Sequence, residues 1–231
     1  MAEEVKPKRR YNSPRRQEQA AATRRSILDA AQLLFEEQGY AATTMEAIAA
    51  EAGVALKTVY LAFSTKSGLL RALWDLVLKG DQDTAPVADR SWYREMLNER
   101  DPVQQLRLNA RNSRVVKERI GPVLEVIRSA APFDADSAAL WELIQTDFYD
   151  NQRAVVSSLH KRQHLRTGLD VFQAADILWT INHPDVWQLL VGRRRWKPAD
   201  YEYWVFSTSR DQLLKAKRLA RPSAPDRPRP R

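Results

Sequence analysis

Four side chains of different chemistry stand close together within the first third of the chain: Lys57, Thr58, Tyr60 and Leu61. They supply a cation, a hydroxyl, a phenol and an alkyl group. At 100° per residue they share one arc of a helix, while Val59 and Phe63 point the opposite way. Base edges in the major groove offer hydrogen-bond acceptors, donors and the thymine methyl group. The outward set is therefore predicted to suit base edges and phosphates.

A helix can present such side chains to the groove only if a second helix supports it through a short turn. Gly53 supplies the turn, and a short helix is predicted before it from the apolar positions Met45, Ile48, Ala49 and Ala52. Thr43 and Glu46 stand three apart, which predicts a capping box at the start of that helix. The stretch 43–66 is thus predicted to be a helix-turn-helix. From spacing alone, an amphipathic helix with a solvated face is the alternative.

The rest of the chain also shows helical spacing of apolar residues, which predicts an all-α fold. A first helix is expected between a Thr23 cap and Gly39, and a fourth from about Ser67. Residues 80–100 are polar and expected to be irregular, and Gly121-Pro122 is expected to break or kink a helix opened by Asp101-Pro102. Three later segments are predicted to be helical: 136–163, 171–190 with an interruption near His183-Pro184, and 199–214.

The net charge of +8 lies in the two ends of the chain. Residues 1–25 hold eight Lys or Arg against three Glu, and residues 217–231 hold six against Asp226. We therefore expect a disordered basic arm (1–20), a DNA-binding domain (21–66), a helical regulatory and dimerisation domain (67–216) and a disordered basic tail (217–231). The absence of cysteine excludes disulfides and thiolate metal sites. Without a signal sequence or a long apolar window, we expect a cytoplasmic protein that does not engage membranes.

Residues 23–75 resemble the N-terminal domain of the TetR family of bacterial regulators. The matching residues are Gly39-Tyr40, Thr43-Thr44, Ile48-Ala49, Ala52-Gly53-Val54, Thr58-Val59-Tyr60, Phe63, Lys66 and Leu69-Leu70. The resemblance implies phosphate contacts from Thr43 or Thr44, Tyr60 and Lys66. It also implies base contacts from Leu56, Lys57, Thr58 and Leu61, with Arg24 in the same footprint. Ala55 departs from the family at a frequent capping Ser, and Ala62 at a frequent His.

In this family the C-terminal helices dimerise and enclose a small-molecule pocket. A dimer interface is expected among the aromatic residues Trp179, Trp187, Tyr201, Tyr203 and Trp204, although an ordinary core is the alternative. The candidate ligand-binding residues are Trp141, Phe148, Tyr149, Trp179, Asn182 and His183. The fourth helix is the expected link between the two functions, with Lys66 at its DNA end and Trp74 and Val77 reaching the regulatory domain.

Catalytic chemistry has little support in the sequence. His160 and His164 stand four apart and could share a metal, but no third ligand is evident, and a solvated helix end is the simpler interpretation. No Gly-rich phosphate loop or HExxH motif is present. We predict a homodimeric repressor without catalytic residues, metal or cofactor, which binds a palindromic operator in double-stranded DNA and is released by a small-molecule effector. The alternatives are an activator or ligand-independent regulator, a helical ligand-sequestering protein with vestigial DNA binding, and a metal-dependent helical enzyme.

Overall fold

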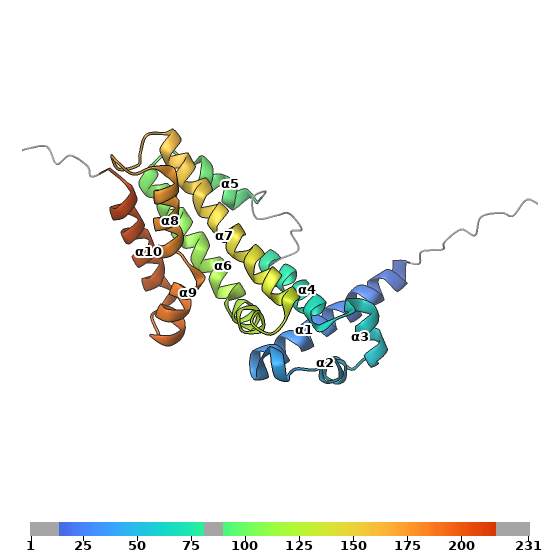
Figure 1. Ribbon diagram of the computed structural model, residues 1–231. Helices are drawn as coiled ribbons and strands as arrows, with labels where there is room; N and C mark the ends of the chain where they lie inside the picture. The colour runs from blue at the N-terminus through green and yellow to red at the C-terminus, as the bar shows by residue number, and fades with distance from the viewer. Residues whose placement is uncertain (1–13, 81–89, 216–231) are drawn as a thin grey trace, which may run out of the picture. The chain divides into compact units, whose positions relative to one another are not determined.

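The computed structural model describes residues 14–80 and 90–215 (Figure 1). Their elements are α1 (Pro14–Ala42), α2 (Met45–Glu51), α3 (Leu56–Phe63), α4 (Lys66–Lys79), α5 (Ser91–Asn98), α6 (Pro102–Ala130), α7 (Ala135–Lys161), α8 (Val171–Ile181), α9 (Pro184–Trp187), the π-helix η2 (Gln188–Arg193) and α10 (Pro198–Leu213). Within these ranges the extended pairing is one isolated bridge between Leu165 and Leu214. The predicted all-α fold is confirmed.

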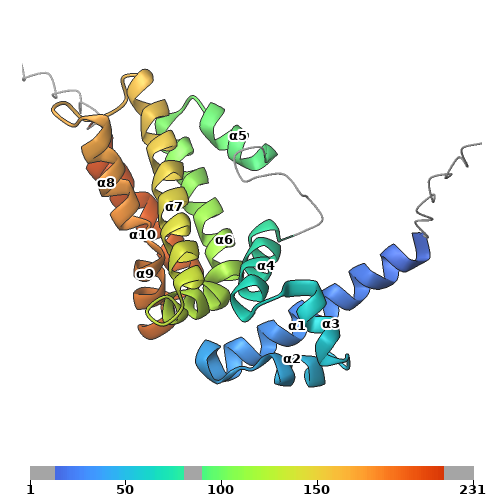
Figure 2. The ribbon, with the colours of Figure 1, turned by 45° about the vertical axis from the view of Figure 1, so that its right-hand side comes forward.

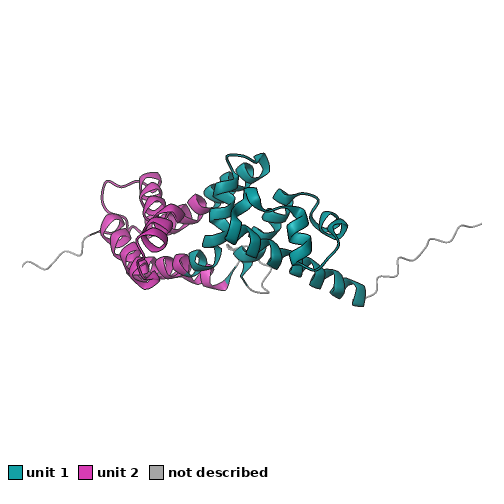
Figure 3. Cartoon of the chain, turned by 90° about the horizontal axis from the view of Figure 1, so that it is seen from below, with its two compact units in different colours: residues 1–90, 115–147 teal, residues 91–114, 148–231 magenta. Residues whose placement is uncertain are grey.

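The chain forms two compact units (Figure 3). Unit 1 comprises residues 1–90 and 115–147, and unit 2 comprises residues 91–114 and 148–231. Along the sequence, α6 and α7 each contribute one part to each unit. The units reflect packing, and the functional domain boundary between residues 66 and 67 stays a prediction.

The first helix begins earlier than predicted. Residues 14–20, assigned to the disordered arm, form the first turns of α1, and Thr23 lies inside the helix rather than at its cap. The segment is rich in Ala, Arg, Gln and Glu, which favour helices, and Pro14 occupies the first helical position. Gly39 interrupts the helix as expected, with φ 81° and ψ 168°. Residues 1–13 of the predicted arm and the tail from residue 216 lie outside the described residues.

Helices α1 to α4 enclose the first core of unit 1 (Figure 2). Apolar side chains from all four helices are fully buried there, including Ile27, Phe35, Ile48, Val59, Leu69 and Leu70. Trp74 and Val77 on α4 are also buried. Burial of this kind, at about 25 cal/mol per Å² of apolar surface, is the main source of stability for such short helices.

Helix α6 continues through Gly121-Pro122, so the expected break does not occur, while the alternative of a kink there stays a prediction. The buried side chains of Ile120, Val123 and Ile127 on either side of the proline hold this part of α6 in unit 1. Tertiary packing therefore outweighs the loss of one backbone hydrogen bond at Pro122.

Unit 2 contains a helix that the sequence did not suggest. Helix α5 occupies part of the segment expected to be irregular, and it buries Tyr93 and Met96. The predicted interruption near His183-Pro184 is confirmed, because α8 ends at Ile181 and α9 starts at Pro184. Helix α8 packs against α10. No helix in the described parts of the chain is long and apolar enough to cross a membrane.

Candidate DNA interface and ligand-binding region

Helix α3 has the two faces expected from its spacing. Val59 and Phe63 are buried, whereas Tyr60 is 45% exposed and Leu61 is 77% exposed. Lys57 is exposed, and Leu56 and Thr58 are half-buried. The helix therefore presents a cation, a phenol and an alkyl group outward, as base and phosphate contacts require.

The start of α2 differs from the prediction by one residue. Thr44, not Thr43, is the N-cap, and its Oγ1 accepts a hydrogen bond from the Ala47 backbone N–H over 3.1 Å. The predicted box between Thr43 and Glu46 is therefore wrong. The Thr43 hydroxyl is fully buried and donates to the carbonyls of Gly39 (2.8 Å) and Leu34 (3.2 Å). With Thr43 inside and Thr44 exposed, only Thr44 can offer its side chain to a phosphate.

Ala55 begins α3 without a side-chain cap. Its backbone is extended (φ −68°, ψ 141°), as an N-cap residue requires, but it makes no side-chain hydrogen bond. At this departure from the family pattern, the first turn of α3 therefore receives no hydrogen bond from the side chain of its N-cap residue.

Lys66 is turned inward, contrary to the expected phosphate contact. Its ammonium donates to the carbonyls of Tyr40 (2.8 Å) and Thr43 (2.9 Å), and it lies 4.3 Å from the centre of the Tyr40 ring. Burial lowers the pKa of Lys66, while the charge of Asp134 opposes that shift. The side chain therefore joins the end of α1 to the start of α4, and two of its three donors are already used.

Arg24 is exposed and sits beside the reading helix. Its Nη1 donates to the Ala62 carbonyl over 2.7 Å, and its guanidinium carbon lies 4.0 Å from the centre of the Phe63 ring. The guanidinium thus fixes α1 against the last turn of α3 and keeps a positive charge next to the outward face.

Polar bonds also attach α1 and α4 to the turn before α7, all within unit 1. The Tyr40 hydroxyl donates to Asp134 over 3.2 Å, and Ser67 Oγ donates to Asp136 over 2.8 Å. Arg119 on α6 donates to the Leu78 carbonyl near the end of α4 over 2.8 Å. Burial, assisted by the charge of Asp134, raises the pKa of Tyr40 to about 12. The helices that carry the candidate DNA face are therefore hydrogen-bonded to α6 and α7.

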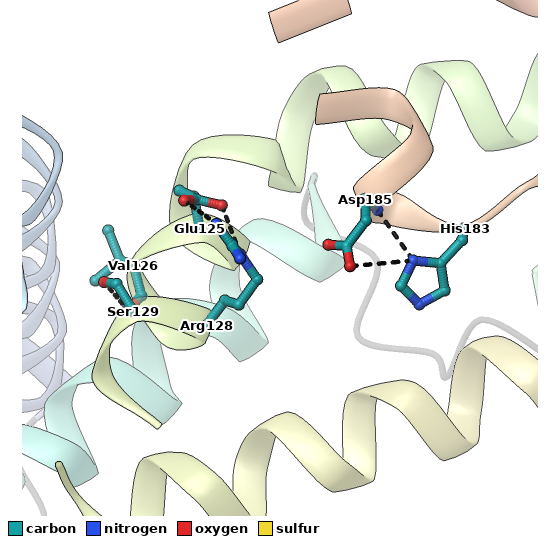
Figure 4. A network of polar contacts seen from close by, with 6 residues as sticks. All are labelled: Glu125, Val126, Arg128, Ser129, His183 and Asp185. Carbon is teal, nitrogen blue, oxygen red and sulfur yellow. Dashed lines mark hydrogen bonds and ion pairs between the residues drawn. The ribbon is translucent and has the colours of Figure 1, made fainter. Parts of the chain in front are cut away.

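Three of the predicted ligand-binding residues meet in unit 2. The Trp179 ring lies edge-on to Tyr149 (centroids 6.2 Å apart) and to His183 (4.7 Å). His183 caps α9: its Nδ1 accepts a hydrogen bond from the Asp185 backbone N–H over 3.1 Å (Figure 4). Phe148 is half-buried in the same unit, whereas Trp141 belongs to unit 1.

Asn182 belongs to a buried polar cluster that sequence reasoning missed. Its Nδ2 donates to Ser113 Oγ (2.6 Å) and to Gln152 Oε1 (3.3 Å), and Gln152 also accepts a bond from Asn109 (3.3 Å). One turn earlier on α6, Gln105 donates to Ser158 Oγ over 3.1 Å. We call this set the polar seam: Gln105, Asn109, Ser113, Gln152, Ser158 and Asn182. The signal was present, since Gln105, Asn109 and Ser113 are spaced four apart on a helix.

The aromatic residues expected at a dimer interface divide into two groups. Trp187 and Tyr201 are buried and pack edge-on with centroids 4.9 Å apart, so both are core residues. Tyr203 on α10 is 66% exposed, and Trp179 and Trp204 are half-buried. Phe172 on α8, which we did not single out, is also 66% exposed. Among these aromatic residues, the rings of Phe172 and Tyr203 are the ones available to a partner.

His160 and His164 do not share a helix face, because α7 ends at Lys161 and His164 lies in the following turn. That removes the geometric basis of a shared metal site, which the sequence had left as the less favoured interpretation. In the part of the chain that the structure describes, no three His, Cys, Asp or Glu side chains are grouped so that they could hold a metal ion.

Comparison with known proteins agrees with this geometry. The model of the family described as "Bacterial regulatory proteins, tetR family" matches residues 27–73. The probable HTH-type transcriptional regulator ArpR of Pseudomonas putida is 28% identical over 167 residues, which are 70% of this chain and 77% of that protein.

Solved structures share the fold. SmeT, the repressor of the Stenotrophomonas maltophilia multidrug efflux pump SmeDEF, superposes with a TM-score of 0.63 at 23% identity, covering 91% of this chain and 99% of SmeT. NalD, the secondary repressor of the MexAB-OprM efflux pump in Pseudomonas aeruginosa, gives 0.63 at 21% identity, covering 85% of this chain and 98% of NalD.

The helix-turn-helix and the surrounding helices define a DNA-binding transcriptional regulator. Residues 27–73 match the TetR-family model, and the chain is similar to TetR-family regulators over most of its length, in line with the sequence resemblance.

Proposed function

We propose that this regulator is a homodimeric repressor that binds a palindromic operator and is released from it by a small-molecule effector. The observation that carries the proposal is the outward face of α3, with Lys57, Tyr60 and Leu61 exposed beside the Thr44 cap. Leu61, at 77% exposure, is the most exposed large apolar residue of the helix-turn-helix. An exposed leucine on a helix that is packed against the core can make an apolar contact with the thymine methyl group in the major groove.

Release by an effector requires a physical connection between ligand-binding helices and α3. Unit 1 contains such connections: α7 bonds to Tyr40 and Ser67 through Asp134 and Asp136, and α6 bonds to the end of α4 through Arg119. A ligand that moves α6 or α7 would strain these bonds and change the position of α3. To shift the equilibrium, the ligand must bind the released conformation more tightly.

Dimer formation is supported by the exposed rings of Phe172 on α8 and Tyr203 on α10, two helices that pack against each other. Exposed aromatic side chains on adjacent helices favour a protein partner, and aromatic residues are enriched at interfaces. In a symmetric dimer the two α3 helices would occupy half-sites about 34–36 Å apart. We further propose that the protein acts in the cytoplasm and has no catalytic activity, in keeping with a relative that is itself a transcriptional regulator.

The test is selection of bound duplexes from random DNA with the full chain. We expect enrichment of an inverted repeat, bound with a steep salt dependence because phosphate contacts release counterions. Leu61→Ala should weaken binding to the selected duplex, and Leu33→Ala, an exposed leucine on α1, serves as the matched control. Failure to enrich any sequence, or equal affinity for selected and scrambled duplexes, would exclude a specific operator.

A further inference from the structure

A short turn between η2 and α10 concentrates positive charge on the surface of unit 2. Residues 193–197 have the sequence Arg-Arg-Arg-Trp-Lys, and all five are exposed. We call residues 193–197 the basic turn. The acidic residue nearest to it in the sequence is Asp200, in the first turn of α10. Four cations against this one carboxylate leave a local net charge of +3.

The four cationic side chains of the basic turn have no partner among the described residues of the chain, where they make neither an ion pair nor a side-chain hydrogen bond. Other arginines of unit 2 are paired: Arg114 with Glu202 at 2.6 Å, and Arg210 with Asp211 at 2.7 Å. Neighbouring like charges repel one another, and a bound polyanion would remove that repulsion. The charges of the basic turn are therefore available to an anionic partner.

Backbone hydrogen bonds hold the basic turn in one conformation. The Arg194 N–H donates to the Leu189 carbonyl over 3.0 Å, and the Trp196 N–H donates to the Leu190 carbonyl over 2.9 Å. Between them, Arg195 has a φ of 60°, in the left-handed region that favours glycine. Glycine would close the same turn without this strain. The position thus carries a charged side chain that lowers local stability, which is a common property of functional positions.

Trp196 anchors the basic turn to α10. Its ring lies edge-on to Trp204, with centroids 6.5 Å apart, and it is 38% exposed. A segment that binds a membrane inserts its apolar side chains into the lipid. Because most of this ring is covered by the protein, the turn offers charge without an apolar anchor. These features favour a nucleic-acid backbone over a lipid surface.

The basic turn lies at the end of unit 2 from which the chain continues into unit 1. Helix α10 begins at Pro198, directly after the turn, and its Glu202 bonds Arg114. Arg114 is the last residue of α6 in unit 2, before the helix continues into unit 1. The other end of α10 is marked by the bridge between Leu165 and Leu214 (Figure 1). The charge is therefore placed where unit 2 is covalently joined to the unit that carries α3.

From these observations we infer that the basic turn is a second DNA contact of this regulator, in addition to the helix-turn-helix. Its ligand is the phosphodiester backbone of double-stranded DNA, bound without regard to sequence. Arginine suits this ligand because its planar guanidinium can donate two hydrogen bonds to one phosphate. Phosphate contacts position a protein on the duplex, while base contacts specify the sequence. The inference requires DNA binding, but neither a particular operator nor release by an effector.

Neutralising two arginines tests this contact in the full-length protein. Arg193→Gln combined with Arg194→Gln should weaken binding to the selected and the scrambled duplex by the same factor. At 0.1 M salt one phosphate contact, with a salt slope of about 0.9, corresponds to about an eight-fold change in affinity. We therefore expect a loss of at least about eight-fold and a slope smaller by at least about 0.9 in fluorescence anisotropy titrations.

The matched control removes two exposed cations at the other end of unit 2, by Lys161→Gln combined with Arg166→Gln. It should change either affinity by less than about two-fold, because salt screens charges that lie beyond about 10 Å from the DNA. Equal losses in the two double variants would mean that only the net charge matters, and unchanged affinity in the first would exclude the contact. Either result overturns the inference.

Arg195→Gly separates a contact with DNA from a role in the fold. Glycine relieves the left-handed backbone, so the midpoint of urea unfolding should stay equal or rise. Binding to both duplexes should nevertheless weaken about eight-fold, as for loss of one phosphate contact. Arg195→Lys, which keeps the charge, should retain most of the affinity. Wild-type affinity in Arg195→Gly would show that Arg195 does not touch DNA.

Other partners of the basic turn are outcomes of the same experiment. Wild type and the Arg193/Arg194 double variant are sedimented with vesicles of phosphatidylcholine and phosphatidylglycerol, and their masses in solution are compared by light scattering. Vesicle binding that the double variant loses, with unchanged DNA affinity, would assign the turn to a lipid surface. A changed mass with unchanged DNA affinity would assign it to contact between protein copies. Both results would overturn the inference.

The two duplexes distinguish this inference from the proposed function. If wild type binds both duplexes equally and the double variant binds both more weakly, the basic turn contacts DNA and the repressor proposal fails. If wild type prefers the selected duplex and the double variant binds it as tightly, the repressor proposal stands and the second contact is wrong.

Discussion

The hydroxyl of Tyr40, near the end of α1, donates a hydrogen bond to the carboxylate of Asp134, the residue before α7, over 3.2 Å. The two residues are 94 positions apart in the chain. Asp134 also accepts from the Ser137 backbone N–H over 2.7 Å, so one carboxylate both begins α7 and holds α1. This pairing is a direct polar connection in unit 1 between the end of α1 and the residue that precedes α7.

Tyr40→Phe tests the strength of that pairing. Although burial raises the pKa of Asp134, hydrogen bonds from Ser137 and Tyr40 and the charge of Lys66 bring it below its usual value. The stabilisation is therefore complete above the usual aspartate pKa and is lost as pH falls through the lower folded-state value. We expect Tyr40→Phe to reduce the free energy of unfolding by about 1–2 kcal/mol at pH 7 and by less at pH 3.

Urea unfolding at the two pH values measures this difference. Tyr60→Phe, measured without DNA, is the control, since it makes the same chemical change on an exposed side chain. An equal loss at both pH values would show that the bond does not depend on the ionised carboxylate.

Lys117, which is fully buried in unit 1, should make the free energy of unfolding depend on pH between neutral and alkaline values. Burial lowers its pKa from 10.5 to about 7. Between these values the unfolded chain carries a proton on this side chain that the folded chain lacks, so stability rises with pH across that window. Lys117→Met should flatten the rise, measured by unfolding at pH 7 and pH 10, whereas Lys79→Met on the exposed end of α4 should not. Parallel pH profiles for wild type and Lys117→Met would contradict this expectation.

Lys57→Ala should reduce specificity rather than stability. The side chain is exposed on the outward face of α3, and a lysine that contacts a base contributes roughly 1–3 kcal/mol of discrimination. We expect fluorescence anisotropy to show a larger loss on the selected duplex than on scrambled DNA. Lys79→Ala is the control for loss of one positive charge. Equal losses on both duplexes would assign Lys57 to phosphate instead.

Lys66→Met should show the opposite behaviour. Because its ammonium bonds the carbonyls of Tyr40 and Thr43, its removal leaves two acceptors at the junction of α1 and α4 without a donor. We expect a loss of roughly 1–3 kcal/mol in the free energy of unfolding. The salt dependence of operator binding should stay unchanged, whereas loss of a phosphate contact would lower its slope by about one. A lower slope with unchanged stability would restore the phosphate role.

Ala55→Ser should stabilise the reading helix. Ala55 already has the extended backbone of an N-cap and lacks only the side-chain acceptor. A serine there is expected to add about 1 kcal/mol and to slow amide hydrogen exchange in α3. Ala62→Ser, at the other end of the same helix, is the comparison. No change in exchange at the start of α3 would mean that water already satisfies those N–H groups.

Sequence patterns predicted what depends on local periodicity. The inward positions Val59 and Phe63 and the interruption at His183-Pro184 follow from helix geometry and proline chemistry, and both are as expected. The cap at Thr43 was wrong and the internal bonds of Lys66 were not foreseen, because a sequence does not show where a long or polar side chain finds its partner. The residues around Lys66 predict an exposed side chain, yet its ammonium donates hydrogen bonds to carbonyls 23 and 26 residues away in the sequence.

The seam shows the same limit in the ligand-binding region. Aromatic residues drew attention to Trp179 and Asn182, but Gln105 and Gln152 became evident only when α6 and α7 were seen in contact. Helix α5 was missed because its two buried residues, Tyr93 and Met96, give too short a pattern. Tertiary contacts supplied the missing information in each case.

The helical start of α1 fixes the positions of the positive charges of Arg15 and Arg16. A flexible arm would sample many positions, but Arg15 and Arg16 stand on a helix that rises about 1.5 Å and turns about 100° per residue. Roughly 13 Å of such helix precedes Thr23, so these arginines keep both a set distance and a set angular phase relative to α3. Inserting one residue between Arg16 and Thr23 would lengthen this segment by only about 1.5 Å. It would also rotate the two arginines by about 100° around the helix axis, so that they would point to a different side of α1.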